Sequence, residues 1–225
     1  MSLENSIQNE LEHLYKWDAG HKVSQEAIKA FGVDKVFVSI DISNEIFSRI
    51  SGKSYKDNCT IPLEDLCYLK LLHYDLNLDI RIGEVICNKS IASDLINVFK
   101  DLYKLKYPIE KILLIDEYNA DDEVSMQDNN SSAFNFRQIV GGGKLSKHAT
   151  GVAIDINPLY NPYVRKETNG NLYVAPENAG PFVDREKDFP YKINHQDICY
   201  QVFTKYGFKW GGDWETRKDY QHFEK

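Results

Sequence analysis

The sequence predicts one α+β domain that follows a short helical segment. The chain has 225 residues, which is enough for one sizeable domain and too few for two full-sized ones. Helix-like and strand-like segments both occur, but they do not alternate strictly as strand, helix and strand. This order favours α+β over a doubly wound parallel sheet. We expect a helical lead-in over residues 1–32 and the main domain over residues 33–225.

Two periodicities place the elements along the chain. Apolar residues at spacings of three and four predict helices, whereas β-branched or alternating apolar runs predict strands. The helices are expected at residues 4–16, 24–31, 90–105 and 195–206. The strands are expected at residues 36–40, 78–86, 111–115 and 152–156, with a short terminal strand around residues 222–224. Ser90 is the expected cap of the third helix, and Gly32 and Gly207 are the expected stops of the second and fourth.

Composition argues against several classes of protein. The chain is 42% hydrophobic and 27% charged, so it can bury a core and is neither a disordered tract nor a membrane protein. The 34 acidic residues outnumber the 27 basic ones, and the net charge of −7 disfavours nucleic acid as a partner. No run approaches the ~18 apolar residues of a membrane span. The four cysteines form no CxxC pair, which argues against a four-cysteine metal site.

Two long segments are expected to be irregular. Residues 116–132 are acidic and polar, which indicates a surface loop. Asp121, Asp122 and Glu123 could bind a hard cation there, although the segment lacks the spacing of an EF-hand. Residues 158–190 hold five of the seven prolines and are expected to form a second excursion.

The first segment with candidate functional residues is SKHATGVAIDIN, residues 146–157. Asp155 lies among apolar strand residues, and a buried carboxylate is costly unless it is paired, hydrogen-bonded or bound to metal. On an uninterrupted strand, His148 and Asp155 would lie on opposite faces. Gly151 offers a turn or bulge that could bring both toward one ion. Taken alone, the segment equally fits a structural aspartate bound to nearby backbone.

The second segment is GFKWGGDWETRKDYQHFE, residues 207–224. Asp219 and His222 are three residues apart, so they would be neighbours in a helical turn and would diverge in a regular strand. His222 could equally be a core histidine. Trp210 and Trp214 could line a peptide groove or belong to the core, and Asp213 could support a metal ligand.

Together, the two segments resemble a known family. SxHxxGxAxD, followed near the C-terminus by GGDW and DxxHFE, resembles the zinc D-Ala-D-Ala peptidases. That family includes VanX- and VanY-type enzymes and the L-alanyl-D-glutamate endopeptidases. The resemblance spans roughly residues 110–225. It implies a hedgehog/DD-peptidase-like fold, in which helices flank a small antiparallel sheet that carries one zinc ion.

The resemblance also implies roles for individual residues. His148, Asp155 and His222 match the three zinc ligands, which would leave a fourth position for water. Asp219 matches the acid that acts as general base, where many members have Glu and the endopeptidase-like branch often has Asp. Ser146 matches a motif serine that touches the substrate or supports the site.

Two further residues complete the expected site. The family places an arginine upstream of the histidine motif, and Arg137 matches it. A fixed guanidinium can stabilise an oxyanion without reorganising, although Arg137 could also be a surface arginine on a strand. Trp214 is the tryptophan expected to contact the substrate. His195 is expected to be a surface or capping residue.

The function that follows is zinc-dependent hydrolysis in bacterial peptidoglycan stem peptides or muropeptides. A D-Ala-D-Ala carboxypeptidase is the first choice, and an L-Ala-D-Glu endopeptidase is the alternative. A zinc-holding binding module without catalysis is a rival from another class, although the acid at Asp219 argues against it. The substrate indicates an extracytoplasmic location, with an export signal outside the given sequence. A cytoplasmic location stays open because muropeptide precursors occur on both sides of the membrane.

Overall fold

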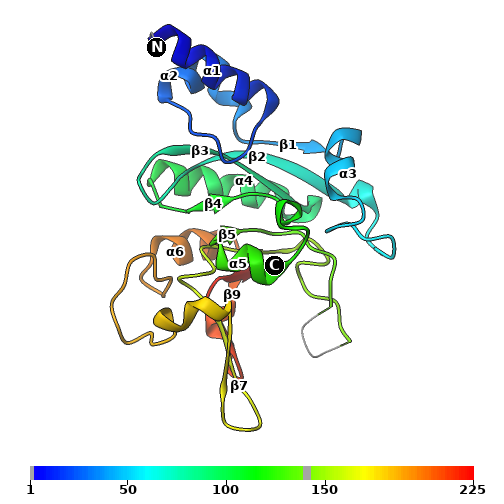
Figure 1. Cartoon of the computed structure of the whole chain (residues 1–225), viewed down its shortest axis with the longest axis vertical. Coiled ribbons are helices and arrows are strands. Elements are labelled where there is room, and N and C mark those ends of the chain that lie inside the picture. The colour runs from blue at the N-terminus through cyan, green and yellow to red at the C-terminus, as the bar shows by residue number, and fades with distance from the viewer. Residues whose placement is uncertain (1–2, 139–142) are drawn as a thin grey trace.

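Three layers form the N-terminal half of the molecule, and the C-terminal half packs beneath them. The computed structural model describes residues 3–138 and 143–225 and has the predicted α+β character. Figure 1 shows α1 and α2 above the sheet of β1, β2 and β3, with α4 below that sheet. The β7 hairpin projects at the opposite end of the molecule from the N-terminus.

The described residues form six α-helices and eleven strands. The helices are α1 (Leu3–Lys16), α2 (Gln25–Phe31), α3 (Asn44–Ile50), α4 (Lys89–Lys104), α5 (Asp122–Gln127) and α6 (Ile198–Lys205). The strands are β1 (Val38–Asp41), β2 (Leu66–Tyr74), β3 (Ile80–Asn88), β4 (Lys111–Ile112), β5 (Asn130–Ser131), β6 (Ala153–Asp155), β7 (Tyr163–Lys166), β8 (Leu172–Ala175), β9 (Lys209–Trp210), β10 (Lys218–Asp219) and β11 (His222–Glu224). Among them, three antiparallel sheets have the orders β1-β2-β3, β10-β7-β8 and β6-β11-β9, and β4 pairs in parallel with β5.

The central strand β2 is the main element that sequence patterning did not predict. Alternate residues of β2 belong to two separate cores: Cys67 and Leu69 pack with α4, whereas Tyr68 and Leu72 pack with the N-terminal helices. A strand covered on both faces shows no apolar–polar alternation, because both of its faces need apolar residues. The run LCYLKLLHY therefore lacks the alternation of apolar and polar residues by which a strand is recognised in a sequence.

The two segments expected to be irregular contain regular structure. Within residues 116–132, Asp121 accepts a hydrogen bond from the backbone N–H of Val124 and so caps α5. This segment is therefore not simply a surface loop. Residues 158–190 include the β7–β8 hairpin, which pairs with β10. The expected cap Ser90 was also wrong, because Asn88 accepts from the N–H of Ser90 and caps α4.

The N-terminal helices pack on the central sheet. Leu14 and Trp17, at the end of α1, share a core with β2 and β3, and the Trp17 indole donates to the carbonyl of Gly83 at 3.0 Å. The boundary at residues 32/33 stays a prediction.

A small sheet of β6, β11 and β9 carries most of the candidate site. Its apolar face joins α4 and α6 in one core, in which Phe223 stacks on Phe203 with ring centroids 4.2 Å apart. The partners Ile154 and Trp210 are buried in the same core. The site therefore rests on a rigid, packed support.

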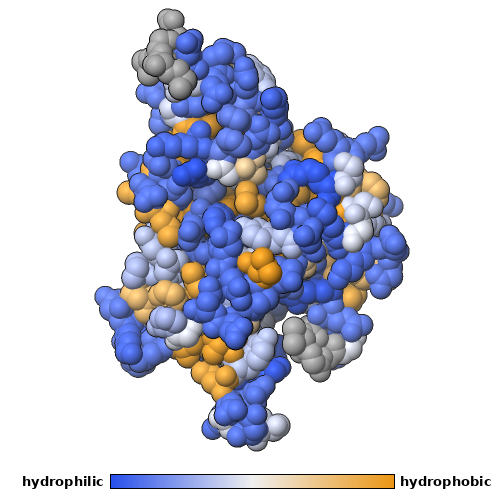
Figure 2. Space-filling model, viewed as in Figure 1, coloured by the Kyte–Doolittle hydropathy of each residue, from blue (hydrophilic) through white to orange (hydrophobic). Residues whose placement is uncertain are grey.

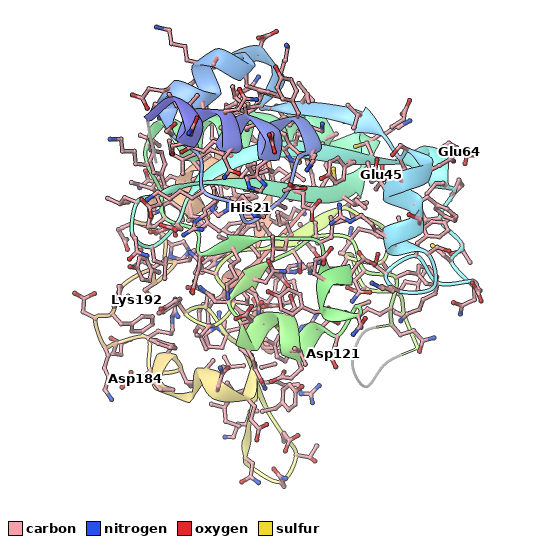
Figure 3. All side chains as sticks on the ribbon, turned by 45° about the horizontal axis from the view of Figure 1, so that its top comes forward. His21, Glu45, Glu64, Asp121, Asp184 and Lys192 are labelled. Carbon is pink, nitrogen blue, oxygen red and sulfur yellow. The ribbon has the colours of Figure 1, made fainter. Side chains whose placement is uncertain are left out.

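One face of the molecule is mainly hydrophilic (Figure 2). Figure 2 shows a mainly hydrophilic face on which hydrophobic residues form small separate patches. Figure 3 shows charged side chains such as Glu45, Asp121 and Asp184 spread over the outside of different elements. No helix among the described residues is long and apolar enough to cross a bilayer.

Gly151 fixes the turn that leads into β6. Its φ is +72°, and a Cβ there would lie 2.7 Å from the backbone nitrogen of Asn88. Its carbonyl accepts a hydrogen bond from that same N–H at 2.8 Å. The turn therefore packs backbone against backbone on the end of β3, which only glycine permits.

We predict that Gly151→Ala destabilises the protein more than Gly170→Ala does. Both glycines have positive φ, but a Cβ at Gly170 would meet nothing within 4 Å. Gly170→Ala should cost about 1 kcal/mol from backbone conformation alone, whereas Gly151→Ala adds a backbone clash. Urea unfolding of both variants measures the difference. Equal losses of unfolding free energy would contradict the account of the turn.

Candidate metal centre

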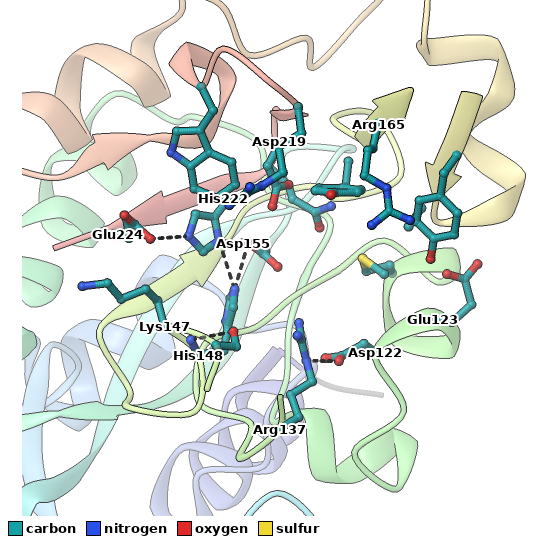
Figure 4. A pocket seen from close by; sticks show the side chains of 18 of the residues that line it. Asp122, Glu123, Arg137, Lys147, His148, Asp155, Arg165, Asp219, His222 and Glu224 are labelled. Carbon is teal, nitrogen blue, oxygen red and sulfur yellow. Dashed lines mark hydrogen bonds and ion pairs between the residues drawn. The ribbon is translucent and has the colours of Figure 1, made fainter. Parts of the chain in front are cut away.

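Three side chains converge at one end of the small sheet. Asp155 ends β6 and lies directly opposite His222, the first residue of β11, in the antiparallel register. His148 comes from the turn before β6, which bends at Gly151 as the sequence suggested. Their side chains are only 6% exposed for His148 and His222 and 13% exposed for Asp155. Figure 4 shows the three pointing toward one another.

Hydrogen bonds fix the tautomers of both histidines. His148 Nδ1 donates to the carbonyl oxygen of Ala133 at 2.6 Å, which leaves Nε2 with a lone pair. His222 Nε2 donates to Glu224 at 3.2 Å, which leaves Nδ1 with a lone pair. When both imidazoles are neutral, the two lone pairs and an oxygen of Asp155 face one another without a proton among them. Such an arrangement is repulsive unless a cation or a proton occupies it.

The geometry of these three atoms fits a zinc ion. His148 Nε2 lies 3.1 Å from His222 Nδ1 and 3.2 Å from Asp155 Oδ1, and the third side of the triangle is 3.1 Å. Tetrahedral donors at the usual zinc distances are about 3.3–3.4 Å apart. Two imidazoles and one carboxylate also form a donor set typical of catalytic zinc, with a fourth position open. These three residues could therefore hold the ion.

The crowding of acceptors also shifts the pKa values. Burial lowers the pKa of His222, but hydrogen bonds to Asp155 and Glu224 outweigh burial and raise it to about 10. Burial raises the pKa of Asp155, but the charge of His148 and hydrogen bonds from both histidines hold it well below its usual range. Both shifts show that a positive charge is favoured at the centre of the triangle.

Asp219 lies beside the triangle on β10. Its Oδ1 is buried and has no hydrogen-bond partner among the described residues, and burial raises the pKa of its carboxyl group to about 7. Gly211 packs closely behind it, since a Cβ there would lie 2.8 Å from the Cβ of Asp219 and 3.2 Å from that of His222. An unpaired buried carboxylate oxygen next to a potential metal site is suited to transfer protons.

Arg137 and Ser146 lie on neighbouring segments of the same pocket. Arg137 forms an ion pair with Asp122, and Figure 4 shows it reaching in from the side of α5. Ser146 donates its N–H to the carbonyl of Arg137 at 3.1 Å, and its hydroxyl accepts from the N–H of His148 at 3.1 Å. Ser146 therefore connects the irregular segment that carries Arg137 to the turn that carries His148.

The two tryptophans have different positions. Trp210 is buried in the core, whereas Trp214 lines the pocket with its ring 5.2 Å from that of His222. Asp213 does not support a ligand, because it pairs with His195 at 2.7 Å outside the pocket. His195 is exposed as expected but caps no helix, since Asp197 caps α6.

One pocket of about 630 Å³ unites all the residues expected in the site. His148, Asp155, His222, Asp219, Arg137, Ser146 and Trp214 all line it. Sequence reasoning missed several polar residues of the lining, among them Tyr163, Arg165, Arg217 and Glu224. Glu224 stood within the quoted DxxHFE motif, so its spacing of two from His222 on a strand was an available signal. Arg165 lies in the segment expected to be irregular, where no pattern marked it.

The acidic residues of α5 do not form a cation site. Asp121 caps the helix, Asp122 pairs with Arg137, and Glu123 accepts from Gln127 at 2.8 Å. Each carboxylate is therefore engaged by a protein partner, and the hard-cation alternative finds no support.

A second group of potential ligands lies near the N-terminus. His13, Asp18 and His21 bring their ligand atoms within 4.8 Å of one another. The two imidazoles are stacked, with centroids 3.8 Å apart and planes inclined by 18°. Lone pairs in the planes of stacked rings run side by side and do not converge on one point. This group is therefore a poorer metal site than the triangle in the pocket.

The comparison with protein families agrees with this geometry. Residues 140–225 match the family model described as D-alanyl-D-alanine carboxypeptidase. The match includes the candidate ligands and Asp219, and Arg137 lies just outside it. No curated protein and no solved structure matches the chain. Residues 140–225 are therefore similar to the D-alanyl-D-alanine carboxypeptidase family, as the two sequence motifs indicated.

Proposed function

We propose that the protein hydrolyses bacterial peptidoglycan stem peptides with zinc, and that D-alanyl-D-alanine carboxypeptidase is its activity. The description of the matched family supports the substrate class. The observation that carries the catalytic part is the buried, unpartnered Oδ1 of Asp219 in the same pocket as the three potential ligands.

His148, Asp155 and His222 would hold the ion in this proposal. When bound, zinc supplies a Lewis acid that polarises the scissile carbonyl and acidifies a water molecule. Glu224 and the carbonyl of Ala133 orient the two imidazoles through their second nitrogens, at 3.2 and 2.6 Å. The protein therefore fixes both the positions and the tautomers of its ligands.

The remaining chemistry belongs to Asp219 and Arg137. Asp219 takes a proton from the attacking water and delivers it to the leaving amine as the peptide bond breaks. Arg137, held by its ion pair with Asp122, stabilises the developing oxyanion on the scissile carbonyl. The guanidinium is already positioned, so little reorganisation is needed during the reaction.

Two alternatives deserve separate tests. An L-alanyl-D-glutamate endopeptidase is favoured by aspartate in place of glutamate at Asp219 and by Trp214 beside His222 in the pocket. A binding module with structural zinc is disfavoured, because such a site has no use for an unpaired buried carboxylate at Asp219.

The proposed substrate places the protein in the cell envelope or outside the cell. Peptidoglycan lies there, although its precursors are also made in the cytoplasm. The location is therefore part of the functional proposal and depends on the substrate.

The bond that is cleaved can be identified directly. We expect zinc-loaded protein to remove one alanine from the C-terminus of L-Ala-γ-D-Glu-Lys-D-Ala-D-Ala, and a chelator to abolish the reaction. Mass spectrometry of the products makes the measurement. Release of the N-terminal alanine would move the protein to the endopeptidase alternative, and intact peptide with stoichiometric zinc would contradict both.

We predict that Asp219→Asn lowers kcat by about 10²–10⁴-fold, the usual contribution of a general acid–base residue. Zinc binding should remain, because Asp219 is not one of the three proposed ligands. Asp213→Asn is the matched control, since Asp213 lies outside the pocket. If Asp219→Asn kept more than a tenth of the wild-type kcat, the proposed general base would be wrong.

The ligand assignment predicts a loss of metal binding. His222→Ala should bind less than about 0.1 zinc ion per chain under conditions in which the wild type binds one, because one of the three protein donors is lost. His195→Ala, which removes an exposed histidine, should bind as the wild type does. Elemental analysis after dialysis measures the ratio. Retained zinc in His222→Ala would show that the ion binds elsewhere.

A further inference from the structure

One face of the sheet β10-β7-β8 forms a wall of the pocket. Tyr163 and Arg165 of β7 line the pocket, whereas the intervening Val164 does not. Arg217, in the bend just before β10, and Asp219 of β10 also line the pocket, whereas the intervening Lys218 does not. Arg165 and Arg217 therefore line the same pocket as the proposed general base.

The strand register brings the two arginines near each other. Asp219 pairs with Tyr163, and Lys218 pairs with Val164. Extended by one position beyond the end of β10, the same register sets Arg217 against Arg165, which pairs with Tyr173 of β8. This pair therefore lies two residues from Asp219 along the strand, or about 7 Å.

Both guanidinium groups are held by aromatic rings and lack a carboxylate. Arg165 lies over the ring of Tyr173 at 5.1 Å, and Arg217 lies over the ring of Trp214 at 4.5 Å. No ion pair or hydrogen bond engages either guanidinium within residues 3–138 and 143–225. Like charges opposite each other across two strands are destabilising. An anion between them would relieve that repulsion.

Most nearby acids are already engaged and do not supply this anion. Asp122 pairs with Arg137, Glu224 with His222, and Glu123 accepts hydrogen bonds from Gln127 and the N–H of Glu177. Two further acids line this wall: Asp219, which is the proposed general base, and Glu215, which is exposed and makes no ion pair with a described residue. The arginine pair is thus available to a ligand.

We propose that Arg165 and Arg217 bind the free α-carboxylate of the substrate residue that bears the leaving amine. This inference rests on the proposed function. Asp219 delivers its proton to that amine, and the amine and the α-carboxylate are bonded to the same α-carbon. A carboxylate bound by the pair would therefore hold the amine toward Asp219. Guanidinium groups suit the task because they bind carboxylates with two parallel hydrogen bonds.

The same chemistry occurs in two substrates. A C-terminal D-alanine carries a free α-carboxylate on the residue that leaves. In L-Ala-γ-D-Glu, the glutamate is linked onward through its side chain, so its α-carboxylate is also free beside the leaving amine. The pair thus selects a carboxylate at this position, and the cleaved bond decides which residue supplies it.

Matched peptides and protein variants test whether Arg165 and Arg217 bind the α-carboxylate. The peptides are the stem pentapeptide with a C-terminal acid or amide, and L-Ala-γ-D-Glu-Lys with the glutamate α-carboxylate free or amidated. The proteins are wild type, Arg165→Met, Arg217→Met and the control Lys166→Met, which removes a charge from the same strand outside the pocket. Steady-state kinetics give kcat/KM, and calorimetry gives the affinity of zinc-loaded Asp219→Asn for each peptide with or without an arginine substitution.

We expect wild type to prefer the acid over the amide of the cleaved peptide by about 10- to 100-fold in kcat/KM, the effect of one hydrogen bond to a charged group. Each arginine variant should lose most of this preference while cleaving the amide at the wild-type rate, and Lys166→Met should keep it. If an arginine substitution lowers kcat/KM equally for the acid and the amide, the proposed binding of the carboxylate by the arginine pair is wrong. The proposed function is unaffected by that result. If no peptide is cleaved, the proposed function fails. In that case calorimetry still tests the arginine pair. Equal affinity for acid and amide, or no binding of either peptide, would show that the pair does not bind the α-carboxylate.

Discussion

The pairing of β6 with β11 is the constraint on which the site depends. It sets Asp155 directly opposite His222, and a shift of either strand by one residue would turn one of the two side chains to the other face. The apolar partners Ile154 and Phe223 lie at the next position and are buried in the core below. Burial of those residues therefore holds the ligands in register, so the stability of the sheet and the geometry of the site have one cause.

Two glycines bring the other groups to this sheet. Gly151 lets the turn that carries His148 press against the backbone at the end of β3. Gly211 lies so close behind Asp219 that there is no room for a Cβ atom at position 211. Gly151 joins segments that are distant in the sequence, whereas Gly211 closes a short loop onto Asp219 and His222. They explain how a site can draw on a turn, two short sheets and the α5 side of the pocket without a long element crossing it.

The order of the elements predicted the α+β class, and the family resemblance of the two motifs implied the convergence of His148, Asp155 and His222. The family comparison supported the same region. Strand β2 was missed, since burial on both faces removes its alternation. Arg165 and Arg217 were missed for a different reason. Their common face follows from the pairing of β7 with β10, and a pairing between distant short strands leaves no local pattern.

We propose that His148, Asp155 and His222 bind one zinc ion at the end of the β6–β11 pair. Anomalous X-ray diffraction at the zinc edge, on crystals of the zinc-loaded protein, would locate the ion. We expect one strong anomalous peak in contact with His148, Asp155 and His222. A pocket without a peak in such crystals, or a peak at the His13 group alone, would contradict it.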